Sequence, residues 1–292
     1  MIIDRLDDIA HRYDAVFCDL WGCLHNGVRP FPDAVAGLEQ FRDGGGIVLL
    51  LTNSPRPAAS VVEQLDGIGV DRALYSAVAS SGDAAQAALA SGRFGRMVYH
   101  FGPTRDEVFF ASVPDNEFFD GIDIERVPLD EAESIVCTGL FDDETETPDD
   151  YRETFLYAAN EGLKLLCANP DIMVDRGDKR IYCAGALAKA YTEAGGESHY
   201  FGKPHAPIYQ LARRRLEDAA GRAIADDRIL CIGDGIATDI QGGVGEGLDT
   251  LFITGGLARE ATRTEDQPDA DALRGFLEEA RLSPTASMGF LR

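Results

Sequence analysis

The stretch AVFCDLWG, residues 15–22, decides the fold of this chain. It is a short apolar run that ends at a carboxylate, Asp19. Two later stretches repeat the pattern of an apolar run followed by polar residues, IVLLLTNSP (47–55) and RILCIGDG (228–235). Continuous apolar runs of this length are typical of strands that are buried on both faces of a parallel sheet. The three runs therefore predict strands of such a sheet.

Segments with a helical spacing of apolar residues separate the predicted strands, at 31–45 and 207–221. Two further segments, SHYFGKP (198–204) and LDTLFITGG (248–256), continue the cycle of strand, turn and helix. Strands that alternate with helices indicate an α/β fold in which right-handed crossovers join parallel strands. We therefore expect a Rossmann-like core with a parallel sheet.

The middle of the chain repeats this cycle on a smaller scale. It holds four runs that we interpret as strands, at 96–103, 122–129, 133–141 and 163–171. We expect a smaller α/β domain over residues 80–183. This domain would be inserted into the core domain, which residues 1–79 and 184–292 would form.

The composition argues against several classes of function. The 292 residues include 27 Lys and Arg against 50 Asp and Glu, and the net charge of −23 repels nucleic acids and anionic membranes. No apolar run approaches the roughly 18 residues of a membrane span, and the acidic start does not fit a secretory signal. We expect a cytoplasmic protein with a small molecule as its partner. The six cysteines lack metal-binding spacing, which favours buried free thiols.

Three carboxylates follow predicted strands. Asp19 follows the first apolar run, and Asp234 and Asp239 lie in the turn GDGIATD after a later one. Ligands of parallel sheets bind outside the carboxyl ends of the strands. Three carboxylates that meet at that edge repel one another unless a cation lies among them, and hard oxygen ligands suit Mg²⁺. The sequence therefore predicts a magnesium site.

Three other polar residues at predicted strand ends supply groups that bind a phosphate. Lys203 is a compact positive charge. Thr52 and Asn53 precede the start of a helix, where side-chain and backbone donors bind anions. A carboxylate, a magnesium ion, a lysine and a hydroxyl at one site describe phosphoryl transfer to a carboxylate nucleophile.

The order of these motifs resembles one enzyme family. VFCDLWG, LLLTNS, GKP and IGDGIATD look like the four motifs of the haloacid dehalogenase-type (HAD) hydrolases. The segment between the second and third motifs resembles their C2 cap domain. ANPD (168–171), followed by CAGAL (183–187), is similar to class IIA, the NagD-like sugar-phosphate and nucleotide phosphatases. The resemblance implies a Mg²⁺-dependent phosphatase for a small phosphorylated metabolite, and relatives of this class often form homodimers.

The resemblance also implies a role for each matching residue. Asp19 would attack phosphorus and bind the metal, and Lys203 would neutralise Asp19 and the phosphate. The other metal-binding groups would be the backbone carbonyl of Trp21 and the carboxylate of Asp234. Asp239, also at the metal site, would hold a metal-bound water or Lys203. The transferring phosphoryl group would contact Thr52 and Asn53, and the cap would close over the substrate through Asn169 and Asp171.

Trp21 departs from the family pattern, which is D-x-D. The second aspartate of that pattern is the general acid and base, and the indole of Trp21 cannot transfer a proton near neutral pH. General acid–base catalysis typically contributes ~10²–10⁴ in rate. His25, six residues after Asp19, and His205, two after Lys203, are candidate substitutes. A structural or phosphate-contacting role stays open for each histidine.

Other interpretations stay open at this point. Trp21 leaves the site without the usual proton donor. The chain could therefore be a catalytically weak or inactive HAD-derived protein that binds a phosphorylated ligand and has a regulatory role. Another chemistry of a carboxylate nucleophile, such as dehalogenation, fits the lysine and the metal-binding carboxylates less well. Asn169 and Asp171 could equally shape the turn at Pro170, and Arg56 could either contact substrate or cap a helix.

Overall fold

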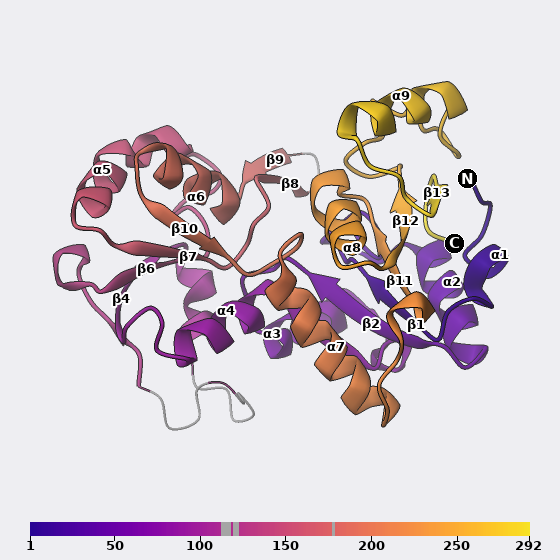
Figure 1. The fold of residues 1–292 in the computed structure, drawn as a ribbon, viewed down its shortest axis with the longest axis horizontal. Coiled ribbons are helices and arrows are strands. Elements are labelled where there is room, and N and C mark those ends of the chain that lie inside the picture. Colours follow the sequence, from indigo (N-terminus) through magenta and orange to yellow (C-terminus); the bar gives the residue numbers. More distant parts are fainter. Residues whose placement is uncertain (112–117, 119–122, 177–178) are drawn as a thin grey trace. The chain divides into compact units, whose positions relative to one another are not determined.

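The structure is a computed structural model that describes residues 1–111, 118, 123–176 and 179–292 (Figure 1). Its contacts divide the chain into two compact units. Unit 1 comprises Met1–Thr52, Val62–Ala79 and Tyr209–Arg292, and unit 2 comprises Asn53–Val61 and Ser80–Ile208. Each unit has a mostly parallel sheet with helices packed on it, which confirms the predicted α/β class.

Unit 1 is built around a six-stranded sheet with the strand order β13-β12-β11-β1-β2-β3. The strands are β1 (Ala15–Cys18), β2 (Ile47–Thr52), β3 (Ala77–Ser80), β11 (Ile229–Gly233), β12 (Asp249–Ile253) and β13 (Ala286–Met288). β1 pairs in parallel with both β2 and β11, so that Cys18 lies between Leu50 and Ile232. All residues of β1 and β11 are buried, as expected for a sheet that is covered on both faces.

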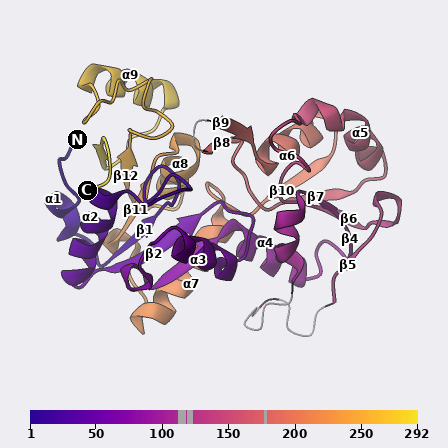
Figure 2. The ribbon, with the colours of Figure 1, turned by 180° about the vertical axis from the view of Figure 1, so that it is seen from behind.

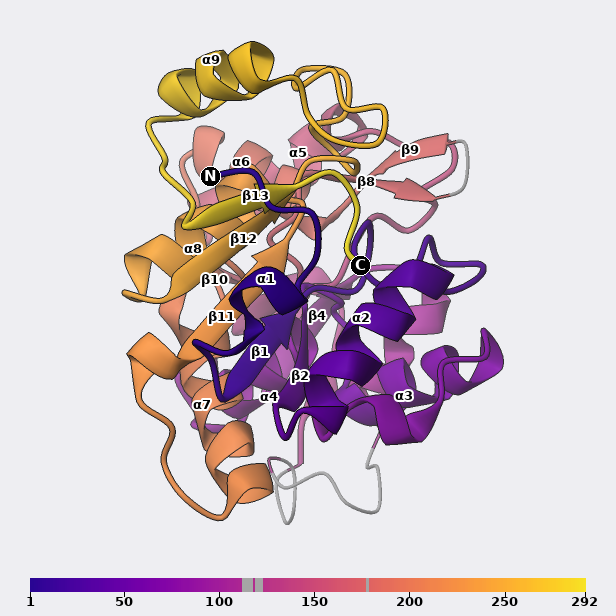
Figure 3. The same cartoon turned by 90° about the vertical axis from the view of Figure 1, so that its right-hand side faces the viewer.

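Helices cover both faces of this sheet. Figure 3 shows α2 (Pro32–Asp43) on one side and α8 (Gln241–Gly245) on the other. α2 has a proline in its first turn and buries Ala34, Leu38 and Phe41, which the helical repeat places on one face. The chain also contains α1 (Asp7–Ala10), α3 (Ala58–Gly67), α7 (Ala206–Ala220) and α9 (Ala270–Ala280).

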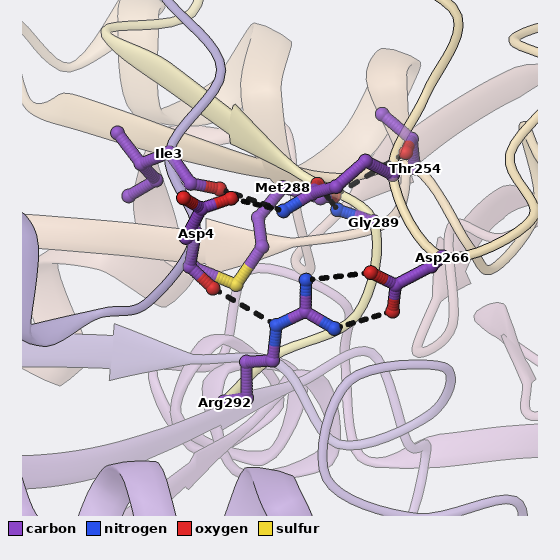
Figure 4. A network of polar contacts seen from close by, with 8 residues as sticks. Ile3, Asp4, Thr254, Asp266, Met288, Gly289 and Arg292 are labelled. Atoms are coloured by element: carbon purple, nitrogen blue, oxygen red, sulfur yellow. Dashed lines mark hydrogen bonds and ion pairs between the residues drawn. The ribbon is translucent and has the colours of Figure 1, made fainter.

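The first and last residues of unit 1 are tied to the sheet by a polar network (Figure 4). Arg292 forms an ion pair with Asp266, and its Nε donates to the backbone oxygen of Asp4 at 2.9 Å. The backbone N–H of Thr254 donates to the carbonyl of Met288 at 2.9 Å. These contacts fix the segment that follows β12 and the strand β13 at the edge of the sheet.

Unit 2 contains a five-stranded sheet with the order β10-β7-β6-β4-β5, in which all four pairings are parallel (Figure 2). Its strands are β4 (Met97–Phe101), β5 (Glu125–Arg126), β6 (Ser134–Cys137), β7 (Lys164–Cys167) and β10 (Glu197–Tyr200). An antiparallel hairpin of β8 (Met173–Arg176) and β9 (Lys179–Tyr182) accompanies it. The helices are α4 (Ser81–Ala90), α5 (Arg152–Asn160) and α6 (Ala184–Glu193). Short 3₁₀ helices of the chain lie at Arg72–Leu74, Thr104–Phe110, Leu129–Glu131, Pro148–Tyr151 and Asp226–Arg228.

The boundary between the units differs from the predicted one in two segments. Residues 53–61 and 184–208 belong to unit 2, not to the unit that contains β1. The reason is packing: α6 buries Leu187 and Tyr191 in the core that α5 and β7 also form, and β10 pairs with β7. The strand predicted near 198–204 therefore extends the second sheet.

Two further expectations can be compared with the described chain. The strand predicted at 122–129 is short, because β5 covers only Glu125–Arg126 and residue 122 lies outside the described residues. Within the described part of the chain, no helix has both the length and the apolar character that a membrane crossing requires.

Candidate active site

The first two site residues lie at the carboxyl end of neighbouring strands in unit 1. Asp19 directly follows β1, and its backbone N–H donates to the carbonyl of Ile232 in β11 at 2.9 Å. Asp234 directly follows β11. Their exposed fractions are only 8% and 6%. The parallel pairing of β1 and β11 therefore brings two buried carboxylates to the same sheet edge.

The thiol of Cys23 lies close to these two carboxylates. One carboxylate oxygen each of Asp19 and Asp234 and the Sγ of Cys23 all lie within 4.8 Å of one another. Cys23 is buried, and burial is the main reason that the pKa of its thiol is raised, with the charges of Asp234 and Asp19 adding to the effect. The site therefore contains two hard oxygen donors and one sulfur donor.

Two glycines fix the carboxylate of Asp234. A Cβ at Gly22 would lie 2.1 Å from Asp234 Oδ2, and one at Gly256 would lie 1.9 Å from the same oxygen. The backbone N–H of Leu257 donates to that oxygen at 3.0 Å. Gly22 also has a φ of +76°, which side chains rarely adopt. The backbone thus encloses this carboxylate more closely than any residue with a side chain would allow.

Asp239 lies in a π-helical turn, Ile236–Ile240, after β11. Its Oδ2 accepts from the backbone N–H of Gly235 at 3.1 Å and from Thr238 Oγ1 at 3.3 Å. It is not part of the group of ligand atoms that Asp19, Cys23 and Asp234 form in the described chain. Its side chain packs over Gly233, where a Cβ would lie 2.0 Å from its Cγ.

Trp21 lies in the loop that follows β1. Its ring makes an edge contact with His25, at a centroid distance of 5.3 Å and an angle of 72°. Gly27 allows the loop to close over the indole, because a Cβ there would lie 2.2 Å from the Trp21 ring. The indole is therefore held by its own loop, and its half-buried position leaves part of it exposed.

His25 is fully buried in the same loop, with no exposed surface. Its Nδ1 accepts from the backbone N–H of Gly27 at 3.0 Å, so a neutral ring carries its proton on Nε2. Burial lowers the pKa of His25 to about 4. The imidazole is therefore neutral near pH 7, and its basic nitrogen already accepts a backbone hydrogen bond.

Four other predicted site residues, Asn53, Asn169, Asp171 and Lys203, form a second group, in unit 2. Asn53 Nδ2 donates to Asp171 Oδ1 at 2.8 Å, and its Oδ1 accepts from the backbone N–H of Lys203 at 2.7 Å. Asn169 Oδ1 accepts from the backbone N–H of Asp171 at 3.0 Å, which closes the turn at Pro170. Asn53, Asn169 and Lys203 are all buried. The structure brings these four residues together, with Asn53 as the link.

Glycine is again required at the centre of this second group. A Cβ at Gly202 would lie 2.4 Å from Asn53 Oδ1 and 2.6 Å from Pro170. Thr52, the last residue of β2, is buried and precedes Asn53 directly in the chain. His205 stacks on Tyr200 at a centroid distance of 5.0 Å, and burial lowers its pKa.

Cys23 is the site residue that sequence reasoning missed. All six cysteines are buried and none is in a disulfide, as expected, but Cys23 also faces two carboxylates. Its position four residues after Asp19 and next to Gly22 is a signal that could have singled it out. A thiol has no place in the oxygen-ligand set that the motifs predict, so the motifs alone do not single out Cys23.

Comparison with known families identifies the class of the protein. Residues 16–113 match the model of the haloacid dehalogenase-like hydrolases, and residues 200–278 match a HAD-hydrolase-like model. A crystal structure of a haloacid dehalogenase-like hydrolase from Brucella suis is 42% identical, and the match covers both chains completely with a TM-score of 0.86. The chain therefore belongs to the haloacid dehalogenase-like family and is a hydrolase, as its four ordered motifs indicate.

Two further relatives are similar over most of the chain. The 5'-nucleotidase YutF of Bacillus subtilis is 25% identical over 256 residues, which are 87% of this chain and 92% of the relative. A glycerol phosphate phosphatase from Mycobacterium tuberculosis, solved in complex with magnesium, is 25% identical. That match covers 88% of this chain and 73% of the relative, with a TM-score of 0.64.

Proposed function

We propose that the protein is a Mg²⁺-dependent phosphatase that hydrolyses a small phosphorylated metabolite, of sugar-phosphate or nucleotide type, through an aspartyl-phosphate on Asp19. The observation that carries this proposal is the meeting of the buried carboxylates of Asp19 and Asp234 at adjacent strand ends. Membership of the haloacid dehalogenase-like family supports it. The names of the two other relatives, a nucleotidase and a glycerol phosphate phosphatase, support the substrate class.

The donor set fits a magnesium ion. Asp19 and Asp234 offer carboxylate oxygens, the ligand type that Mg²⁺ prefers, and the backbone around Asp234 Oδ2 fixes the orientation of that carboxylate. The backbone carbonyl of Trp21 would be a further ligand, and Asp239 would hold a metal-bound water or Lys203. When bound, the metal would neutralise charge that develops on the transferring phosphoryl group.

Asp19 performs the covalent step in this proposal. Its carboxylate oxygen attacks phosphorus, the bond from phosphorus to the ester oxygen breaks, and the leaving alkoxide takes a proton from a donor or from solvent. Water then hydrolyses the acyl phosphate, which releases inorganic phosphate and restores the carboxylate. The direct placement of Asp19 after β1 fixes its backbone and so limits the reorganisation that attack requires.

The second group of residues and Thr52 bind the phosphate in this proposal. Lys203 and Thr52 supply a positive charge and a hydroxyl, and Asn53 holds the backbone of Lys203 in place. Asp171 positions Asn53 by accepting a hydrogen bond from its Nδ2, and Asn169 in turn holds the backbone of Asp171. A cytoplasmic location, the absence of a nucleic-acid or membrane partner and a homodimer are further parts of this proposal.

Trp21 and His25 determine the rate that we expect. Trp21 cannot replace the second aspartate of the family as a proton donor. We do not assign that role to His25, because its ring is neutral near pH 7 and Nδ1 accepts from Gly27. The leaving group therefore takes its proton mainly from solvent. We expect aryl phosphates to react faster than alkyl phosphates, since aryl oxides leave without prior protonation.

The same observation favours one alternative function, a phosphorylated-ligand binding protein with little or no turnover. A screen of phosphorylated metabolites with Mg²⁺ separates the two. We expect phosphate release by the natural chain and a loss of roughly 10³-fold or more in Asp19→Asn. Asp249→Asn is the matched control, because Asp249 lies in β12 of the same unit and pairs with Arg12. Thermal stabilisation by ligands without phosphate release would instead support the binding protein.

A further inference from the structure

The Sγ of Cys23 gives the site a donor that a magnesium ion does not need. Mg²⁺ and Ca²⁺ take oxygen ligands, whereas thiolates select softer ions such as Zn²⁺. Cys23 is buried and lies within 4.8 Å of the carboxylate oxygens of both Asp19 and Asp234. We propose that Asp19, Asp234 and Cys23 also bind thiophilic divalent ions such as Zn²⁺, with the Cys23 sulfur as a direct ligand. These ions would compete with Mg²⁺ for the two carboxylates.

The spacing of the three donors suits one ion. Zinc binds thiolate at about 2.3 Å and carboxylate oxygen at about 2.0–2.2 Å. A thiolate and a carboxylate oxygen bound to the same ion are therefore at most about 4.5 Å apart, and closer in tetrahedral geometry. The three donor atoms lie within 4.8 Å of one another, which is close to that separation. Three protein ligands leave a fourth position for water or phosphate.

The position of Cys23 is not a general property of the cysteines near the site. Cys18 precedes Asp19 directly, yet its Sγ donates to the backbone oxygen of Asp19 at 3.2 Å. Cys231 lies three residues before Asp234 and contacts the position of Gly243. Among the described residues, neither of these cysteines belongs to the group of ligand atoms. The loop that begins at Gly22 is what directs a thiol to the carboxylates.

Binding of a soft ion requires a simple exchange. A bond forms between sulfur and the metal, the thiol proton leaves to water or buffer, and a water or the magnesium ion departs from the site. No oxidant or reductant takes part. The inference shares Asp19 and Asp234 with the proposed function, but it does not depend on turnover, because it concerns only which ions the three donors hold.

A cobalt titration tests the inference directly. Co²⁺ replaces Zn²⁺ at such sites, and a bond to thiolate adds a charge-transfer absorption that oxygen ligands alone do not give. We expect this absorption in the full-length natural chain, its loss in Cys23→Ser, and its retention in Cys231→Ser. Zn²⁺ affinity, measured by competition with a chelating dye, should fall about tenfold or more in Cys23→Ser.

Mg²⁺-dependent thermal stabilisation shows that the variant remains folded with its oxygen ligands intact. Absence of the absorption in the natural chain, or an unchanged absorption in Cys23→Ser, would overturn the inference. If Cys23→Ser unfolds, Cys23→Ala is measured in its place. Phosphatase activity without a cobalt–thiolate band would refute this inference alone, whereas the band without activity would refute only the proposed function.

Discussion

The carboxyl edges of the two parallel sheets differ in how their charges are arranged. In unit 1 the edge gathers like charges, because Asp19 and Asp234 meet beside Cys23. In unit 2 the polar residues at the ends of β4 and β6 lie next to partners of opposite charge or next to hydrogen-bonding partners. Arg105 forms an ion pair with Asp143, and Thr138 Oγ1 lies 2.9 Å from His100 Nε2. Both sheets are mostly parallel, yet their carboxyl edges differ. The edge in unit 1 favours an added cation, whereas the charged and polar side chains at the edge in unit 2 pair with one another.

Asp106 shows the contrast most clearly. It is buried in unit 2, and burial raises its pKa, while Arg105, Arg56 and a hydrogen bond with Thr138 oppose the shift. A buried carboxylate in unit 2 therefore has arginines nearby. The carboxylates of unit 1 have each other and a thiol nearby, and a divalent ion would supply the positive charge there.

The largest effect should come from filling the space beside Asp234. Gly22→Ala places a methyl group 2.1 Å from Asp234 Oδ2 and should displace that carboxylate, with a loss of phosphatase activity of about 10²-fold or more. Gly69→Ala is the control, because Gly69 also has a positive φ, of +87°, but has no atom within 4 Å of the added methyl. Equal activity losses in the two variants would show that backbone strain is responsible, and not the displacement of the Asp234 carboxylate. Initial rates with an aryl phosphate provide the measurement.

A second effect concerns the pH dependence of stability that buried His25 and half-buried His100 each produce. Burial lowers the pKa of both His25 and His100 to about 4, below the unfolded value of about 6.5. The unfolded chain therefore binds more protons between these values, so stability is fully present above pH ~6.5 and is lost as the pH falls through ~4. For fully buried His25 the loss should reach about 3 kcal/mol.

Urea unfolding at several pH values measures this dependence. His25→Gln should flatten the profile of unit 1 and His100→Gln that of unit 2. A profile that His25→Gln leaves unchanged would mean that the imidazole is accessible and free to take up a proton, which would return it to the list of proton donors.

A smaller effect concerns the carboxyl edge of the sheet in unit 2, where Arg105 and Asp143 form an ion pair. Arg105→Ala leaves the buried carboxylate of Asp143 without its ion pair and should lower the free energy of unfolding by about 1–2 kcal/mol. Mg²⁺ affinity should not change, since this edge already holds its own positive charges. The reverse outcome, a stable variant with weakened Mg²⁺ binding, would erase the distinction between the two edges. Calorimetric titration and urea unfolding measure the two quantities.

The sequence predicted the centre of unit 1 well, and physical reasons explain why. β1 and β11 are buried on both faces, so their residues are uniformly apolar, and the first polar residue after each is a site carboxylate. The sheet to which β10 belongs was not predictable in this way. Its residues, Glu197–Tyr200, are mostly polar and none of them is buried, and the strand with which they pair depends on the packing of α6 against β7.

Cys23 and His25 show where motif reasoning ends. The direction of the Cys23 thiol depends on the positive φ of Gly22, which spacing along the chain does not reveal. His25 lies six residues after Asp19, and this position suggested proton transfer. Its burial and the hydrogen bond that it accepts from Gly27 depend on how the loop folds back on itself. Both properties belong to the tertiary structure.

The central claim is that Asp19 and Asp234 together hold a divalent ion, and Mn²⁺ binding followed by electron paramagnetic resonance tests it most directly. Mn²⁺ accepts the same oxygen ligands as Mg²⁺. The account predicts one tight Mn²⁺ per chain, lost in both Asp19→Asn and Asp234→Asn and kept in Asp106→Asn, the buried carboxylate of the other edge. Tight Mn²⁺ binding that survives in Asp19→Asn and Asp234→Asn would contradict it.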